Sequence, residues 1–249
     1  MSTQAIAREI AICPRVLPCY FPGTAGDFWI MHLLPELRQN LLNPINRWLK
    51  RALDIVAALI LGALSLPVLA CAAIWIKLVS PGKVFYQQER RGEGGRSLWI
   101  PKLRTMHPNA ERLLLRVLSE SPEIHAEWKC HFKLKKDPRI LSPIGGLLRK
   151  TSLDELPQLW TVLKGEMSLV GPRPFPEYHL DQFDSRFRTL RGRVKPGLTG
   201  LWQVSDRSDG DLAVQEALDT YYIRNWSLWL DLYILARTVR AVVFPRGAY

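Results

Sequence analysis

The sequence predicts an α/β protein that is mostly helical and bound to a membrane. The run from Ile55 to Ile76 contains 22 residues without a charge. As a helix this run measures about 33 Å, enough to cross a hydrocarbon core of about 30 Å. Val84–Arg104 contains two short stretches rich in aromatic and β-branched residues, joined by Gly92–Gly95, as is typical of a β-hairpin. Asn109–Lys136 has a helical composition, so helices are expected to accompany this small sheet.

Length and charge limit the classes of function. The 249 residues suffice for one domain with a core and an appended segment. The 34 Lys and Arg residues outnumber the 23 Asp and Glu residues, giving a net charge of +11. Phosphates, nucleotides, nucleic acid or an acidic lipid surface are therefore expected partners. The four cysteines form no C-x-x-C pair and the five histidines no metal-binding pattern, so a zinc site is disfavoured.

Residues 1–45 differ from the rest of the chain. Their short apolar pieces are interrupted by Pro14, Pro18, Pro22 and Pro35, and none is long enough to cross a membrane. The segment also lacks the pattern of a signal peptide. It is interpreted as an N-terminal extension, within which Asp27–Leu42 is compatible with a helix.

The apolar run itself is interrupted by Pro67. An interior proline removes one backbone hydrogen bond and costs about 3 kcal/mol unless the helix bends, and the Ser65 hydroxyl is expected to bind a freed carbonyl. Basic residues flank the run on both sides, so the positive-inside rule is satisfied at both ends only if both ends are cytoplasmic. The flanking residues are Arg47, Lys50, Arg51, Lys77, Lys83, Arg90 and Arg91. A bent, re-entrant helix meets this condition, and a straight crossing is the alternative.

Two further stretches are predicted to lie in the membrane interface. Ile140–Leu148 is apolar and follows the basic stretch Lys133–Arg139. Asp219–Val243 mixes tryptophan and tyrosine with arginine, and Asp231 interrupts any clean span, which favours one amphipathic helix. A helix in the core of the globular body is the alternative for this last stretch.

The adjacent acids Asp154 and Glu155 indicate phosphate chemistry, because they stand among basic residues in the stretch Arg149–Pro174. One carboxylate can attack phosphorus and form an acyl phosphate. The other can hold Mg²⁺, which commonly uses one or two carboxylates together with substrate phosphates. The pair taken alone is explained more simply by helix capping, since Ser152 and Glu155 have the spacing of a capping box. Gly171–Pro174 can likewise be a turn that ends a helix.

The complete motifs are more specific than the pair. TSLDELPQLWTVLKGEMSLVGPRP, KPGLTGLWQVSDR and KLRTM resemble the bacterial polyprenol-phosphate phosphoglycosyl transferases, the undecaprenyl-phosphate sugar-phosphate transferases, over about Asn46–Val243. The resemblance implies transfer of a sugar phosphate from a UDP-sugar to a polyprenol (undecaprenyl) phosphate with release of UMP. That reaction would be the first membrane step of polysaccharide or glycoconjugate assembly, exopolysaccharide and lipopolysaccharide included, at the cytoplasmic face of the bacterial inner membrane.

The resemblance also implies an architecture. It indicates a monotopic membrane protein with a re-entrant helix broken at a proline over residues 46–80 and a cytosolic catalytic domain over residues 81–249. Two positions depart from the family pattern. Leu66 stands between Ser65 and Pro67, which leaves the angle of the bend open. Asp206 occupies a position where relatives usually have glycine.

Roles for individual residues follow from the resemblance. Asp154 is the expected nucleophile, forming a covalent aspartyl intermediate, and Glu155, with Asp154, is the expected ligand of Mg²⁺. Arg173 is the first choice for binding the donor phosphates, because its planar guanidinium can form two parallel hydrogen bonds. The other expected substrate-binding residues are Lys102, Arg104, Arg149, Pro172, Gly200, Trp202 and Gln203.

Other classes of protein stay open at this point. A membrane-anchored module that binds anions or nucleic acid fits the charge, and a single-span anchor for a structural domain fits the apolar run. The expected partners are a UDP-sugar, polyprenol phosphate and membrane lipids, without nucleic acid. The residues do not decide the sugar, the lipid length, the pathway or the oligomeric state, and a homodimer is kept as an alternative.

Overall fold

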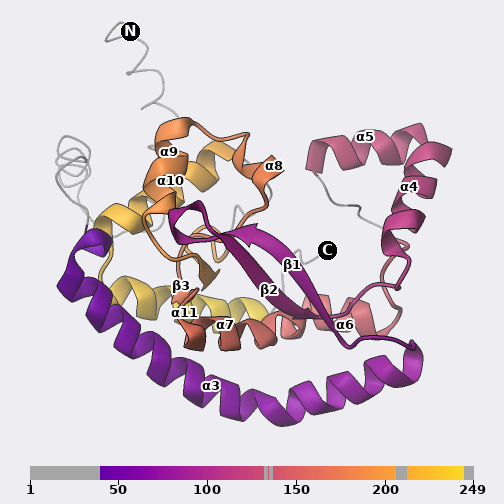
Figure 1. Cartoon of the computed structure of the whole chain (residues 1–249), viewed down its shortest axis with the longest axis horizontal. Coiled ribbons are helices and arrows are strands. Elements are labelled where there is room, and N and C mark those ends of the chain that lie inside the picture. Colours follow the sequence, from indigo (N-terminus) through magenta and orange to yellow (C-terminus); the bar gives the residue numbers. More distant parts are fainter. Residues whose placement is uncertain (1–39, 132–133, 135–136, 206–211, 244–249) are drawn as a thin grey trace, which may run out of the picture. The chain divides into compact units, whose positions relative to one another are not determined.

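The computed structural model describes residues 40–131, 134, 137–205 and 212–243, so most of the predicted N-terminal extension, together with Asp206, lies outside the described residues. The described chain is mostly helical, with two small two-stranded sheets (Figure 1). In chain order the elements are η2 (Asn40–Leu42), α3 (Pro44–Val79), β1 (Phe85–Arg91), η3 (Glu93–Gly95), β2 (Ser97–Leu103), α4 (Ala110–Glu120), α5 (Pro122–His131), α6 (Ile144–Lys150), η4 (Leu153–Gln158), α7 (Leu159–Lys164), β3 (Ser168–Val170), α8 (Glu177–Leu180), α9 (Ser185–Gly192), β4 (Gly197–Thr199), α10 (Leu212–Asn225) and α11 (Leu228–Val243).

Helix α3 contains the predicted membrane segment and continues through Pro67. It begins at Asn43, whose side chain accepts a hydrogen bond from the Ile45 N–H at 2.9 Å. Figure 1 shows that α3 curves and that both of its ends rise on the same side. The expected role of Ser65 is wrong in detail. Its hydroxyl donates to the Gly62 carbonyl at 2.9 Å, whereas the carbonyl deprived of an N–H partner by Pro67 is that of Ala63.

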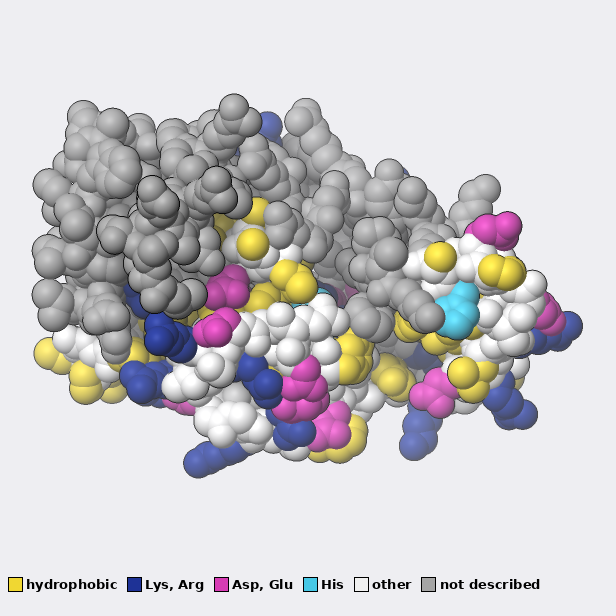
Figure 2. All heavy atoms as spheres, turned by 90° about the horizontal axis from the view of Figure 1, so that it is seen from above, with side chains coloured by type: hydrophobic (Ala, Val, Ile, Leu, Met, Phe, Trp, Pro, Cys, Tyr) yellow, Lys and Arg dark blue, Asp and Glu magenta, His cyan; other side chains and the backbone are white. Residues whose placement is uncertain are grey.

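One side of α3 is an exposed apolar surface. In the described part of the chain, α3 is the one helix whose length and hydropathy suffice to cross a membrane. Its exposed side chains include Trp48, Val56, Leu59, Ile60, Leu64, Leu66, Ile74, Trp75 and Leu78. A large exposed apolar surface marks a site of contact with a membrane or with a partner protein. Figure 2, which views the opposite side of the molecule, shows acidic and basic side chains interspersed among the described residues.

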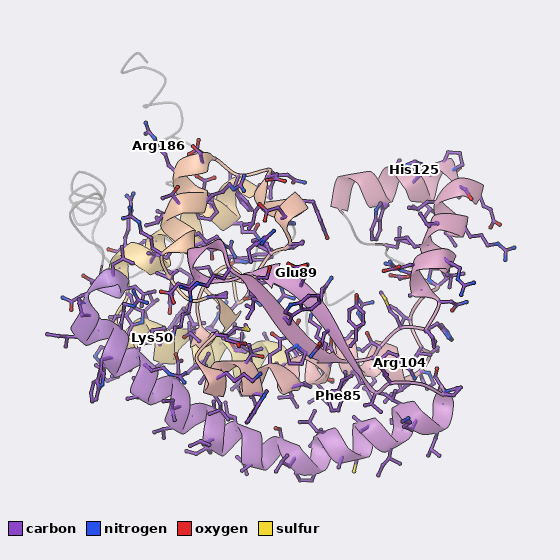
Figure 3. All side chains as sticks on the ribbon, viewed as in Figure 1. Lys50, Phe85, Glu89, Arg104, His125 and Arg186 are labelled. Atoms are coloured by element: carbon purple, nitrogen blue, oxygen red, sulfur yellow. The ribbon has the colours of Figure 1, made fainter. Side chains whose placement is uncertain are left out.

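The other side of α3 is fixed to the body by a buried ion pair. Lys50 Nζ lies 2.6 Å from Asp231 Oδ2, and Trp226 Nε1 donates to the same oxygen at 3.1 Å. The Tyr222 hydroxyl lies 2.7 Å from Asp231 Oδ1 and 2.9 Å from the Val170 carbonyl oxygen. Figure 3 labels Lys50 near the first turns of α3. Asp231 therefore joins α3 to α11, α10 and β3.

Two more polar residues of α3 extend this attachment. Asp54 accepts hydrogen bonds from the Ser168 hydroxyl at 3.1 Å and from the Leu169 N–H at 3.0 Å. Arg51 donates to the carbonyls of Val162 and Leu163 at 2.5 and 2.7 Å. The first half of α3 is thus hydrogen-bonded to α7 and β3.

The predicted hairpin is confirmed. Strands β1 and β2 pair antiparallel from Phe85 opposite Leu103 to Arg91 opposite Ser97. The prediction of one helix over Asp219–Val243 is wrong in its bounds, because α10 ends at Asn225 and α11 begins at Leu228. The Ser227 hydroxyl accepts a hydrogen bond from the Leu230 N–H at 3.2 Å, as expected of a residue that caps a new helix.

Helices α6, α7 and α11 lie next to α3. The apolar cluster that joins α6 to α3 contains Ala72, Ile76, Ile144 and Leu148. Each of the three helices also exposes large apolar side chains, among them Leu147 on α6, Trp160 on α7 and Trp229 on α11. Helix α11 therefore combines a buried face, as expected of a core helix, with an exposed apolar face, and its location in the membrane interface stays a prediction.

Strands β3 and β4 pair in parallel, with Ser168 opposite Gly197 and Val170 opposite Thr199. The carboxyl ends of parallel strands meet at the same edge, so the turn that begins at Gly171 lies beside the turn that begins at Gly200. The two backbones touch at Gly197, where a Cβ atom would overlap the Gly171 backbone. Glycine is required there because no side chain fits between the strands.

Asp231→Ala is expected to lower the free energy of unfolding by about 3 kcal/mol, because it removes the carboxylate that forms the buried ion pair with Lys50. Denaturant unfolding in detergent micelles measures this loss. Arg116→Ala is the control, since it breaks an ion pair with Glu120 in which both side chains are largely exposed. Equal stabilities of the Asp231 variant and the control would show that the buried pair does not fix α3.

Candidate active site

The acid pair lies in η4, the short 3-10 helix between α6 and α7. Ser152, which precedes η4, has a left-handed φ of 55° and forms no side-chain capping hydrogen bond. The capping-box alternative is therefore wrong. The Glu155 side chain is held instead by cations from other elements.

Glu155 forms ion pairs with two basic side chains that are distant from it in sequence. Lys102 Nζ from β2 lies 2.7 Å from Glu155 Oε1, and Arg173 Nη2 from the turn after β3 lies 2.9 Å from the same oxygen. The Glu155 side chain is 17% exposed. Burial opposes its ionisation, but the charges and hydrogen bonds of Arg173 and Lys102 outweigh burial and lower the pKa of Glu155 to about 2. Glu155 is thus a permanent anion at neutral pH.

Asp154 behaves in the opposite way. It is 8% exposed, and its burial, followed by the charge of Glu155, raises its pKa to about 6 despite the nearby Lys102 and Arg149. The pKa of Asp154 therefore lies above the ordinary range of carboxyl groups, whereas that of the adjacent Glu155 lies below it. Such a division marks acid–base or nucleophilic sites more often than structural pairs.

The predicted arginines take different positions. Arg149 lies on the exposed side of α6, where its charge lowers the pKa of Asp154. Arg104, which is labelled in Figure 3, instead donates hydrogen bonds to the carbonyls of Ser80 and Pro81, at 2.6 and 3.1 Å. Arg104 therefore stabilises the carboxyl end of α3 and forms no hydrogen bond with the acid pair.

The other predicted substrate-binding residues follow the two parallel strands. Pro172 and Gly200 are buried, and a Cβ atom on Gly200 would overlap the Gly171 carbonyl. Trp202 packs against an aromatic cluster made by Phe175, Phe183 and Phe187. The Trp202 Nε1 and Gln203 Oε1 atoms are buried without a hydrogen-bond partner among the described residues. This turn therefore holds two polar atoms whose hydrogen bonds are not made within the described chain.

Two residues of β1 outside the expected site set, Gln88 and Arg90, lie near the site, because Arg90 is close to Arg173. Both lie on the same face of the hairpin as Lys102, since Ile100 stands opposite Gln88 and Leu98 opposite Arg90. Arg90 Nη2 donates to Gln88 Oε1 at 2.6 Å, and burial, together with the nearby Arg173, lowers the pKa of Arg90. Strand alternation could have found them, because residues two apart share a face.

The donor set of the acid pair fits magnesium. Among the described residues, no group of three or more His, Cys, Asp or Glu side chains is arranged to hold a metal ion. The hydrogen bonds from Lys102 and Arg173 both go to Glu155 Oε1, which leaves Oε2 and the Asp154 carboxyl as oxygen donors. Mg²⁺ is typically held by one or two carboxylates plus substrate phosphates and water, so the pair fits Mg²⁺ bound together with a phosphorylated substrate.

Asp154→Asn is expected to raise the free energy of unfolding at pH 8 by about 3 kcal/mol, since the pKa of Asp154 is raised by about two units and each unit corresponds to about 1.4 kcal/mol. The folded-state pKa of about 6 exceeds the ordinary value of 3.8, so ionisation of Asp154 destabilises the fold progressively across that interval. The gain in the free energy of unfolding should therefore reach its full value above pH 6 and decrease as the pH falls toward 4. Unfolding measured at pH 8 and pH 4 tests this, with Glu120→Gln on α4 as the control. A variant less stable than the wild type at pH 8 would contradict the burial argument.

Comparison with known proteins shows the family. A sequence model described as bacterial sugar transferase matches residues 45–245. The chain is 43% identical over 248 residues to the UDP-galactose-lipid carrier transferase of Erwinia amylovora, covering 97% of this chain and 50% of that relative. It is 43% identical over 209 residues to the exopolysaccharide production protein ExoY of Sinorhizobium fredii, covering 84% and 91%. It is 42% identical over 207 residues to the UDP-glucose:undecaprenyl-phosphate glucose-1-phosphate transferase of Caulobacter vibrioides, covering 80% and 72%.

The extent of these matches settles membership. The chain spans about half the length of the Erwinia relative, 50%, but 91% of the Sinorhizobium relative. The family match includes α3, the hairpin, the acid pair and both parallel strands. The chain therefore belongs to the bacterial sugar transferase family.

Proposed function

We propose that the protein transfers a sugar phosphate from a UDP-sugar to undecaprenyl phosphate and releases UMP, at the cytoplasmic face of a bacterial inner membrane. The observation that carries this proposal is Glu155, held by Lys102 and Arg173 beside the buried Asp154, whose pKa is about 6. Membership of the bacterial sugar transferase family, and relatives named for UDP-sugars and undecaprenyl phosphate, supply the substrate classes.

In the first step an oxygen of the Asp154 carboxylate attacks the β-phosphorus of the donor. A bond forms between that oxygen and phosphorus, and the bond from phosphorus to the bridging oxygen breaks, so UMP leaves with the electron pair. The charge that develops on the leaving phosphate lies near Lys102 and Arg173, which are already held in place by Glu155. Bound Mg²⁺, held by Glu155 and Asp154, would supply further neutralisation of the diphosphate charge.

In the second step a phosphate oxygen of the lipid attacks the same phosphorus. The bond to Asp154 breaks and the carboxylate is regenerated, so the products are a polyprenyl diphosphosugar and free enzyme. The covalent stage allows the soluble donor and the lipid acceptor to occupy the site in turn. Arg173 and Lys102 serve both steps, because each transfers the same charged phosphoryl group.

The attachment of α3 supports a re-entrant path in the membrane. Near its beginning α3 is bound to the body by Lys50 and Asp54, and at its end Arg104 binds the Ser80 carbonyl. Both ends are thus tied to one folded unit, and Figure 1 shows them rising on the same side. A straight crossing would place one end on the far side of the bilayer from that unit. The exposed Trp160 and Trp229 would lie in the interface on the unit's own side.

Cysteine labelling tests this path. Single cysteines introduced as Ile45→Cys and Lys83→Cys, in a background in which the native cysteines are serine, stand at the exposed flanks of α3. Neither should react with a membrane-impermeant maleimide in intact cells, and both should react once the membrane is permeabilised. Labelling of one flank in intact cells would establish a straight crossing.

Asp154→Asn is expected to abolish UMP release, with a loss of at least about 10³-fold, because the amide is not a competent nucleophile. Release is measured with UDP-galactose, UDP-glucose and UDP-N-acetylgalactosamine, the donors in the names of relatives. Mass spectrometry of wild-type enzyme quenched with donor alone should find the sugar phosphate on the peptide that contains Asp154. Near wild-type turnover by Asp154→Asn would rule out this nucleophile. A module that only binds anions or nucleic acid would release no UMP from any donor.

Glu155→Gln is expected to raise the Mg²⁺ concentration needed for half-maximal turnover by about tenfold, since it removes one charged ligand while keeping the side-chain volume. Titration of activity with MgCl₂ measures the shift. Glu120→Gln on α4 is the matched control, because Glu120 is exposed and its ion pair with Arg116 lies within the same helix. An unchanged Mg²⁺ requirement would remove Glu155 from the metal site.

A further inference from the structure

Three basic side chains gather beside the first turns of α3, where Figure 3 labels Lys50. Arg47 and Arg51 lie one helical turn apart on α3, and Lys195 stands just before β4. Arg51 Nη2 and Lys195 Nζ lie 3.4 and 3.6 Å from the same point, the place that a Cβ atom on Gly165 would take. We call Arg47, Arg51 and Lys195 the basic cluster. Within the described chain none of the three forms an ion pair with the acid pair.

One charge of the basic cluster is balanced by an ion pair. Arg47 pairs with Glu93 at the tip of the hairpin. Arg51 donates both of its terminal nitrogens to backbone carbonyls near the end of α7, which carry no net charge. Among the described residues no carboxylate forms an ion pair with Arg51 or Lys195. The cluster therefore has two positive charges without a paired acid.

Lys195 is the member of the cluster whose charged group is open to a ligand. Its Nζ has no hydrogen-bond partner among the described residues, and it is not one of the buried polar atoms. Burial, followed by the charge of Arg51, lowers the pKa of the Lys195 ammonium. Arg47 adds to this effect, whereas Glu93 and Asp54 oppose it. Like charges at this separation repel, so an anion beside Lys195 and Arg51 would relieve a repulsion within the fold.

The position of the cluster along α3 indicates the source of that anion. Arg51 precedes Ile55, the first residue of the uncharged run, by four residues, which is about 6 Å along the helix. The headgroup layer of a bilayer adds about 5–8 Å on each side of the hydrocarbon core, so Arg51 lies at headgroup depth when the run fills that core. Trp48, which is 74% exposed, stands between the two arginines in the sequence, and tryptophan is typical of this boundary. The anion available at this depth is the phosphate of a phospholipid.

We propose that the basic cluster binds the headgroup phosphate of an anionic phospholipid such as phosphatidylglycerol, with Lys195 as hydrogen-bond donor and Arg51 as the neighbouring charge. The acyl chains of this lipid would lie against the exposed apolar side of α3. The unpaired positive charge favours a lipid with a net negative headgroup over a zwitterionic one. The bound lipid would hold the beginning of α3 at the membrane surface.

The lipid of this site is neither the donor nor the acceptor of the transfer reaction. The inference needs α3 to lie in a membrane, but it does not depend on Asp154 as nucleophile or on UMP as product. Binding of the lipid and turnover of the enzyme can therefore be measured separately.

Thermal unfolding of the full-length protein in detergent micelles, titrated with dioleoylphosphatidylglycerol, tests the assignment. This lipid should raise the Tm, because it binds the folded state, and dioleoylphosphatidylcholine, which has the same chains and no net charge, should raise it less. Lys195→Gln should increase the phosphatidylglycerol concentration needed for half of the stabilisation by about fivefold, as expected for the loss of one basic residue at an anionic surface. Lys83→Gln is the matched control, because Lys83 is an exposed basic residue beyond the other end of α3.

Glu93→Gln should have the opposite effect. It removes the carboxylate that pairs with Arg47 and leaves the Arg47 guanidinium free to attract the lipid. The concentration of phosphatidylglycerol needed for half of the stabilisation should therefore fall. A gain of affinity of this kind does not arise from a damaged fold, so this variant guards against misreading the loss in Lys195→Gln.

The outcomes separate the basic cluster from general attraction and from the reaction. Equal shifts in Lys195→Gln and Lys83→Gln overturn the site, because they show attraction to overall charge. Equal stabilisation by the two lipids overturns the preference for an anionic headgroup. Undecaprenyl phosphate that stabilises at lower concentration than phosphatidylglycerol, with equal sensitivity to Lys195→Gln, overturns the phospholipid and assigns the cluster to the acceptor. Binding as expected, in a protein that releases no UMP from any UDP-sugar, supports the cluster and removes the proposed function.

Discussion

The buried pair of Lys50 and Asp231 is the interaction on which the rest of the structure depends. It joins α3, the predicted membrane helix, to the body through two charges that are more than nine-tenths buried, and Tyr222 connects the same carboxylate to the Val170 carbonyl. Val170 ends β3, and the turn that follows β3 carries Arg173 to Glu155. The position of α3 and the position of the acid pair are therefore set by one connected group of polar contacts.

The electrostatics of the acid pair follow from this scaffold. Glu155 receives two cations on one oxygen and stays ionised, whereas Asp154, one residue away, is buried and has a raised pKa. The difference arises because η4 directs the two side chains into different surroundings. The two adjacent carboxyls therefore differ in their chemistry. Glu155 is an anion suited to hold cations, and Asp154 has a more basic oxygen, suited to attack phosphorus in the proposed reaction.

The surface is divided in a way that suits the proposed reaction between a soluble and a lipid substrate. Large apolar side chains are exposed on α3 and on the neighbouring α6, α7 and α11, whereas the described residues on the opposite side include charged side chains of both signs among apolar and uncharged ones (Figure 2). The acid pair lies in η4, which connects α6 to α7 in the chain. Both of these helices adjoin α3. This placement keeps Asp154 and Glu155 near the apolar side, while the hairpin and α9 extend away from it (Figure 1).

The sequence by itself determined the features that depend on neighbours along the chain. The uncharged run of α3, the hairpin around Gly92–Gly95 and the motif with Asp154 and Glu155 were all predicted from local patterns. Only the tertiary structure decided that Lys102 and Arg173 meet on Glu155 and that Arg104 serves the end of α3. It also decided that Asp231 is the buried partner of Lys50. Composition and periodicity report what a residue is and which face it occupies, whereas an ion pair between residues 181 positions apart depends on how the elements pack.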